Sequence, residues 1–195
     1  MPTVDMLLNH LQTSGLLLQH DTALLSVTAL IVYTPIFGSW WSHPQGNQIY
    51  ALLNTLTEHP DVLVVKLVRG KATFLHRRLW PALLGVACAH EEWQFAKLSK
   101  QALTLYEEVE ELGVLRATGT VPKELERRLL VQSSQQHTER GHHELQLMSW
   151  RFWAEQCECT ADVPALLGRL QLEEALQTIG GRPDSLPWYT KNRAK

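Results

Sequence analysis

The feature that most constrains the fold is a short run in which a helix, a strand, an Arg-Gly turn and a second strand follow one another. Apolar spacing predicts the helix over residues 45–57, and His59-Pro60 ends it because a residue before proline is pushed out of helical geometry. Residues 61–68 and 71–75 have strand composition, and Arg69-Gly70 between them suits a tight turn. The run therefore predicts a β-hairpin directly after a helix.

This hairpin and its flank are strongly basic. Residues 62–90 contain no acidic side chain, and five cations fall within thirteen positions: Lys66, Arg69, Lys71, Arg77 and Arg78. The net charge of the whole chain is −2, so contact with a polyanion is expected only at this segment. A basic wing of two strands suits contact with a nucleic-acid backbone. The same charges also suit a surface hairpin that they keep soluble and protect from edge pairing.

The elements before the hairpin favour one fold class. Two further helices are predicted over about residues 3–12 and 21–32, so three helices precede the hairpin. This order is seen in winged helix-turn-helix folds, in which the third helix enters the major groove and the wing touches phosphates. Gln45, Asn47 and Gln48 could then contact base edges, although the third helix contains no lysine or arginine.

The rest of the chain is predicted to be mostly helical. Helices are expected over residues 79–89, 99–112, 122–156 and 163–178, with a short strand at 114–116. We therefore expect a mainly helical α+β protein with a winged-helix-like part over 1–80, a helical part over 81–180 and a polar tail over 181–195. The alternative is a single integrated domain. The sequence contains no evident internal repeat.

Composition limits the class of protein. At 195 residues and 45% hydrophobic content, the chain can bury a core without disulfides or metal. The three cysteines are expected to be reduced thiols, and no metal site is expected because Cys157-Glu158-Cys159 lacks a second cysteine pair. The most apolar window, residues 22–37, is shorter than the ~20 residues that span a bilayer. We therefore expect a cytoplasmic protein without a membrane partner.

A second candidate site lies in the predicted long helix. His137, Glu139 and His143 fall on adjacent turns of that helix, where histidine and glutamate can act as acid and base or bind a transition metal. The spacing is not that of H-E-x-x-H, and the chain also lacks G-x-S-x-G and the P-loop motif. The alternative for these residues is a polar network between helices or a basic patch.

Large rings gather before the third helix and after the hairpin. Trp40, Trp41 and His43 lie in a predicted loop, and His76 and Trp80 flank the two arginines after the second strand. Rings in a loop can stack on bases. They more often fill the core, and two consecutive tryptophans cannot both point fully inward.

Three motifs together carry a family resemblance. Residues 38–46 read GSWWSHPQG, residues 76–81 read HRRLWP and residues 137–143 read HTERGHH. They resemble a family of uncharacterised bacterial proteins with GSWWxHPxG, HRRLWP and HTExGxH motifs. The resemblance implies a bacterial, cytoplasmic protein of this size, and it implies that the three motifs converge on one site.

Three functions follow from these patterns. The leading one is nucleic-acid binding, in regulation or DNA repair, with Lys66, Arg69, Lys71, Arg77 and Arg78 on the backbone. The first alternative is an enzyme acting on an anionic, phosphate-bearing substrate, in which His43, His76, the two arginines, His137, Glu139 and His143 share a cleft. The second is a protein-interaction module without chemistry. The sequence identifies no cofactor and leaves DNA against RNA and the oligomeric state open.

Overall fold

The computed structural model describes residues 2–137 and 143–189. Within these ranges the chain forms nine α-helices and two three-stranded antiparallel sheets, which confirms a mainly helical α+β fold. Two compact units can be distinguished. Unit 1 consists of Met1–Trp80 together with Leu170–Lys195, and unit 2 consists of Pro81–Arg169. The chain therefore leaves unit 1, forms unit 2 and returns to unit 1.

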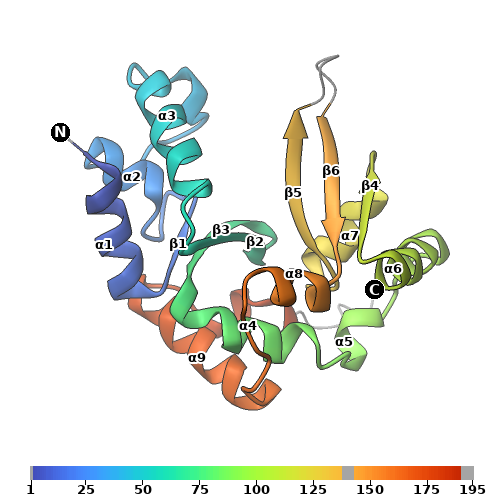
Figure 1. The fold of residues 1–195 in the computed structure, drawn as a ribbon. Coiled ribbons are helices and arrows are strands. Elements are labelled where there is room, and N and C mark those ends of the chain that lie inside the picture. Colours follow the sequence, from blue (N-terminus) through green and yellow to red (C-terminus); the bar gives the residue numbers. More distant parts are fainter. Residues whose placement is uncertain (1, 138–142, 190–195) are drawn as a thin grey trace, which may run out of the picture. The chain divides into compact units, whose positions relative to one another are not determined.

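Unit 1 combines a small sheet with three whole helices and the larger part of α9 (Ala165–Thr178) (Figure 1). In chain order its first elements are α1 (Val4–Ser14), β1 (Leu16–Leu18), α2 (Val27–Val32), α3 (Gly46–Thr57), β2 (Val62–Val68) and β3 (Lys71–His76). The spatial order of the strands is β1-β3-β2, and both pairs are antiparallel. The predicted first helix, third helix and hairpin are thus present close to their predicted positions.

Two details of unit 1 differ from the prediction. The strand β1 was missed, because three consecutive leucines are too short a run to separate strand from helix. The second helix begins at Val27 and not near residue 21, and Ser26 Oγ caps it by accepting the N–H of Ala29. Asp21 instead closes a turn, in which its Oδ1 accepts the backbone N–H groups of Ala23 and Leu24.

The core of unit 1 lies between its sheet and its helices. The strands β1 and β3 contribute Leu16, Leu17 and Phe74, each of which is almost fully buried. Helices contribute Leu11 and Ile49, which are also fully buried. The returning segment is part of this unit, because the backbone N–H of residue 25 bonds to the carbonyl of residue 179. Burial of these side chains is the main stabilising term for the unit.

Unit 2 contains the second sheet and most of the remaining helices. Its elements are α4 (Trp80–Ala87), α5 (Glu92–Phe95), α6 (Lys100–Leu112), β4 (Val114–Ala117), α7 (Val121–Arg127), β5 (Gln132–His137), β6 (His143–Met148) and α8 (Trp150–Gln156). The helix α9 (Ala165–Thr178) then leads back into unit 1. A cluster of buried side chains from α6, α7 and the sheet forms its core: Ala102, Tyr106, Val109, Leu125, Leu130, Val131 and Leu147.

The predicted long helix over residues 122–156 is wrong. This stretch forms α7, the antiparallel pair β5–β6 and α8. Leu129 has a φ of 53°, which ends the helical run after α7. Beyond it, Leu145 and Leu147 alternate with polar residues, and Leu147 is fully buried while it pairs with Ser133 and Leu115. This alternation of apolar and polar residues indicates a strand. It was overlooked because glutamine and leucine are also common in helices.

The two units share one arrangement of elements. Each has a helix, a strand, further helix and then a hairpin, and the strand order β4-β6-β5 of unit 2 repeats β1-β3-β2 of unit 1. In both, a glycine with positive φ, Gly15 or Gly113, ends the helix that directly precedes the first strand, α1 or α6. In both, the carbonyl of that glycine accepts an N–H from the end of the hairpin, that of His76 or Ser149, at 2.9 Å. The architecture therefore repeats where the sequence does not.

Among the residues that the structure describes, no helix combines the length and apolar character needed to cross a bilayer. The apolar window over residues 22–37 holds only the short helix α2, whose Ile31 is fully buried.

Candidate functional site

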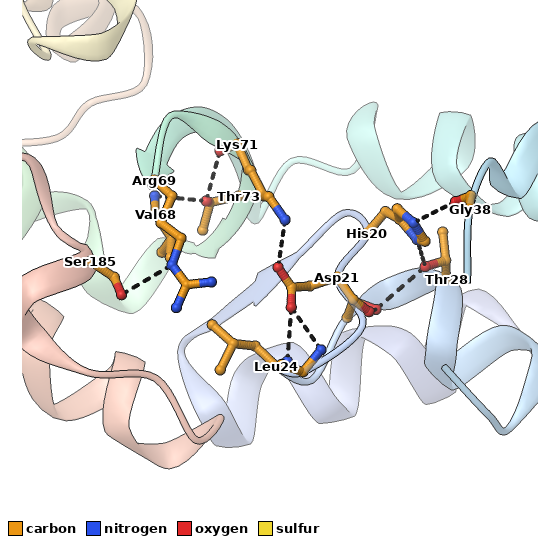
Figure 2. A network of polar contacts seen from close by, with 12 residues as sticks. His20, Asp21, Leu24, Thr28, Gly38, Val68, Arg69, Lys71, Thr73 and Ser185 are labelled. Atoms are coloured by element: carbon orange, nitrogen blue, oxygen red, sulfur yellow. Dashed lines mark hydrogen bonds and ion pairs between the residues drawn. The ribbon is translucent and has the colours of Figure 1, made fainter. Parts of the chain in front are cut away.

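The basic hairpin is anchored at its tip by a buried carboxylate (Figure 2). Lys71 Nζ donates to Asp21 Oδ2 at 2.7 Å, and the Asp21 side chain is only 3% exposed. Burial alone would raise the pKa of this carboxyl, but the bonds from Lys71 and from two backbone N–H groups lower the pKa to about 2. The charge of Lys71 is therefore largely compensated within the protein.

Arg69 fixes the turn from the other side. Its backbone N–H donates to the carbonyl of Ser185 at 2.9 Å. Its Nε donates to Ser185 Oγ at 3.3 Å, a bond that Figure 2 shows. Arg69 has a φ of 52° and Gly70 one of 68°, the left-handed pair that a two-residue hairpin turn requires. The Arg69 side chain is exposed and its partner is neutral, so its charge remains available at the surface.

The arginines after β3 differ in their partners. Arg77 Nη1 bonds to Asp61 Oδ1 at 2.9 Å, and its guanidinium lies 5.9 Å from the centre of the Trp80 ring. Arg78 Nη2 instead donates to the backbone carbonyl of Thr13 at 3.2 Å. A carbonyl orients a guanidinium without neutralising it. Arg78 is exposed, and among the residues that the structure describes no carboxylate is paired with it.

Lys66 is half-buried on β2, an edge strand of the sheet in which the pairing is irregular between Val65 and Val68. A lysine at such a position also protects the edge from pairing with another chain. Within the described ranges, three of the five predicted cations thus have no carboxylate partner: Lys66, Arg69 and Arg78.

His76 acts as a cap in the structure. Its Nδ1 accepts the backbone N–H of Arg78 at 3.3 Å, at the start of the 3-10 turn η2 (Arg77–Leu79). Burial is the largest cause that lowers the pKa of His76; the Asp61 carboxylate opposes it and the Arg78 guanidinium adds to it. The imidazole is therefore a neutral acceptor at pH 7.

Lowering the pH is expected to reduce the stability of unit 1, because His76 then takes up a proton. A lowered pKa means that the folded chain binds fewer protons than the unfolded one, so the free energy of unfolding falls as pH drops below the ordinary value of about 6.5. Asparagine retains an acceptor at this position and does not titrate. In urea titrations at pH 7.5 and 5.5, the wild type should lose more stability on acidification than His76→Asn. Equal losses would contradict this role for His76.

The aromatic residues before α3 divide into a buried and an exposed member. Trp40 is 8% exposed and Trp41 61% exposed, and both lie in the 3-10 turn η1 (Trp40–Ser42). The two rings stack with centroids 4.0 Å apart. His43 caps the following turn, where its Nδ1 accepts the N–H of Gln45 at 3.2 Å. Trp40 therefore belongs to the core, whereas Trp41 lies at the surface.

The predicted catalytic residues are not arranged as expected. The backbones of His137 and His143 pair with each other at the ends of β5 and β6, so these two residues do not lie on adjacent turns of a helix. Glu139 lies outside the described residues. His43, His76, Arg77 and Arg78 belong to unit 1, while His137 and His143 belong to unit 2.

A hollow of about 500 Å³ in unit 2 contains none of the predicted site residues. Its lining is mostly apolar and includes Leu84, Cys88, Trp150 and Cys159. Burial, and secondarily the charge of Glu110, raises the pKa of the Cys88 thiol, which disfavours the thiolate. In the part of the chain that the structure describes, no three His, Cys, Asp or Glu side chains are grouped to hold a metal ion.

Sequence reasoning missed the residues that hold the hairpin. Asp21 and Ser185 lie 50 and 116 positions away from their partners Lys71 and Arg69. It also missed His20, whose Nδ1 bonds to Thr28 Oγ1 and whose Nε2 bonds to the carbonyl of Gly38. The one available signal in the sequence was a single aspartate between two apolar runs, residues 16–18 and 23–25.

No protein-family model matches this chain, and neither a curated protein nor a solved structure is significantly similar to it.

Proposed function

We propose that unit 1 is a winged-helix-like unit that binds nucleic acid, with the β2–β3 hairpin as the wing. The order helix, strand, helix, helix and then the two strands of the hairpin supports this, because a wing after the third helix places cations beside the helix that enters the groove. Composition supports it too. Unit 1 has nine basic and seven acidic residues, a net charge of +2, whereas unit 2 has nine basic and thirteen acidic residues, −4.

The observation that carries the proposal is the set of cations without a carboxylate partner on the hairpin and its flank. Arg69 and Arg78 are exposed, and each is held by neutral oxygen acceptors, Ser185 Oγ and the Thr13 carbonyl. Their charges are thereby positioned without being compensated. Contact of such groups with phosphates releases counterions, which is the main source of affinity in nucleic-acid binding.

The exposed side of α3 is suited to bases and not to phosphates. Asn47, Tyr50 and Asn54 are exposed and lie three and four residues apart, so they share one stripe of the helix. Asparagine can make two hydrogen bonds to the edge of adenine. The helix contains no lysine or arginine, so in this proposal it supplies base contacts while the hairpin supplies phosphate contacts.

Removing the two uncompensated arginine charges is expected to weaken nucleic-acid binding. Arg69→Asn keeps a residue that tolerates positive φ, and Arg78→Gln keeps a donor for the Thr13 carbonyl. Fluorescence anisotropy of a labelled duplex should give a Kd about tenfold higher for the double variant at ~50 mM salt. The slope of log Kd against log salt should decrease by about 1.8, because each lost phosphate contact contributes about 0.9.

The matched control removes two exposed cations elsewhere. Lys100→Ala/Arg182→Ala makes the same change in net charge, and Arg182 is already paired with Asp184. This variant should bind as the wild type does. Equal weakening by both double variants would point to a general charge effect, and absence of wild-type binding to duplex or single strand would refute the proposal.

A further inference from the structure

Trp41 is held in a fixed orientation at the surface. It stacks on the buried ring of Trp40 with an interplanar angle of 24°, and the ring of Tyr50 lies 5.3 Å from it between centroids. Trp41 is 61% exposed and Tyr50 is 42% exposed. An exposed indole supported in this way has lost its rotational freedom before any partner arrives, so binding to it costs little further entropy.

These rings adjoin the helix that makes base contacts in the proposed function. The carbonyl of Trp41 lies against the start of α3, where a Cβ added at Gly46 would be 3.0 Å from it. Tyr50 lies within α3, on the same exposed stripe as Asn47 and Asn54. The aromatic surface and the amide groups of α3 therefore face the same partner.

Two consecutive residues connect the aromatic loop with the basic hairpin (Figure 2). His20 Nε2 donates to the carbonyl of Gly38 at 3.1 Å and so holds the start of the loop that carries Trp41. The next residue, Asp21, binds Lys71 on the hairpin. The loop that carries Trp41 and the basic hairpin are thus both attached to one short segment of unit 1.

The chemistry of the aromatic surface restricts what it can bind. The rings of Trp41 and Tyr50 lie beside the amide of Asn47, and α3 itself contains no lysine or arginine that could bind a phosphate. Ring faces stack on bases, and in a duplex the faces of the bases are already covered by their neighbours. Away from the ends of a duplex, only a base that has left the helical stack exposes a face to Trp41.

From this we infer that Trp41 and Tyr50 form a stacking platform for an unpaired base, and that unit 1 prefers nucleic acid with unpaired bases beside a duplex. The inference rests on the proposed function and specifies its substrate class. The cations of the hairpin bind the phosphate backbone of the nucleic acid, and the platform binds where a base is unpaired.

The test compares three labelled DNA ligands: a duplex, the same duplex with a central unpaired bubble, and one strand alone. The duplex and the bubble carry the same number of phosphates, so a difference between them isolates the bases. The wild type should bind the bubble about tenfold more tightly, equivalent to about 1.4 kcal/mol and within the range for stacking one base. Trp41→Ala should remove this preference, so that this variant binds the bubble and the duplex with the same affinity.

Two further variants make the result specific. Trp41→Phe retains a ring and should keep part of the preference, while Phe37→Ala removes an exposed ring, 83% exposed, outside the stack and should keep all of it. Binding of the bubble should also change the tryptophan fluorescence of the wild type more than that of Trp41→Phe. Circular dichroism of each variant would confirm that the fold is retained.

The outcomes separate this inference from the proposed function. Equal affinity for bubble and duplex, or a preference that survives Trp41→Ala, overturns the platform while the effect of Arg69→Asn/Arg78→Gln leaves nucleic-acid binding in place. Loss of that arginine effect, or no binding to any of the three ligands, overturns both.

Discussion

Replacing Asp21 with asparagine is expected to lower the free energy of unfolding by about 2 kcal/mol at pH 7. The carboxyl is 3% exposed, and its pKa of about 2 against an ordinary 3.8 corresponds to that difference in stability. Asparagine keeps an oxygen for the N–H groups of Ala23 and Leu24 but cannot compensate the charge of Lys71. The change therefore measures the ion pair and leaves the turn intact.

The pH dependence identifies the cause. Because the pKa of Asp21 is lowered by folding, its contribution is complete above about pH 4 and is lost as the pH falls toward 2. Urea titrations should show the gap between wild type and Asp21→Asn closing over that range. Asp184→Asn is the control, since its pair with Arg182 is well exposed and should contribute little. A gap that persists at pH 2 would contradict this account.

The same variant has an opposite effect on binding under the proposed function. Without Asp21, the ammonium group of Lys71 is free to contact a phosphate, so duplex affinity at ~50 mM salt should rise while stability falls. A variant that is less stable and binds more tightly separates the two roles of this pair. If the folded variant binds the duplex more weakly than the wild type does, Lys71 does not contact the phosphate backbone of the nucleic acid.

The largest loss of stability is expected from Gly85→Ala in α4. A Cβ added there would lie 2.0 Å from the carbonyl oxygen of Val163, and a backbone group cannot move aside as a side chain can. Gly168 makes the reciprocal approach, with an added Cβ 2.4 Å from the carbonyl of Ala82. Overpacking of this kind should cost about 3 kcal/mol or more.

The sign of this change makes the test decisive. At an open helical position, glycine to alanine stabilises by about 1 kcal/mol, because alanine is the better helix former. Thermal unfolding followed by circular dichroism should instead show a marked fall in Tm for Gly85→Ala. Unchanged or increased stability would mean that α4 and the segment before α9 are not packed this closely.

The sequence was informative where local chemistry alone decides the structure. His59-Pro60 ends α3, and the Arg69-Gly70 turn joins β2 to β3, because proline and glycine restrict the backbone whatever the rest of the chain does. The hairpin β5–β6 was missed for the opposite reason. Its glutamines and leucines suit helix and strand alike, and pairing with the distant β4 decides between them.

The residues of the candidate site could be predicted from the sequence, but which of their charges lack a carboxylate partner could not. The basic cluster could be read from the chain, whereas which cations remain uncompensated depends on partners distant in sequence. Lys71 is compensated by Asp21, and Arg69 meets only the hydroxyl and carbonyl of Ser185. Contacts between residues so far apart in the sequence leave no pattern in the neighbouring residues. Which cations remain uncompensated is therefore known only from the folded structure.

The discontinuous course of unit 1 has a consequence for synthesis on the ribosome. Unit 2 is encoded entirely between the two segments of unit 1, so all its residues emerge before Leu170 does. The backbone N–H of Arg69 can form its hydrogen bond only after Ser185, 116 residues later in the chain, has been synthesised. We expect the nascent chain to complete its second unit first, with the hairpin of the first anchored only near the end of translation.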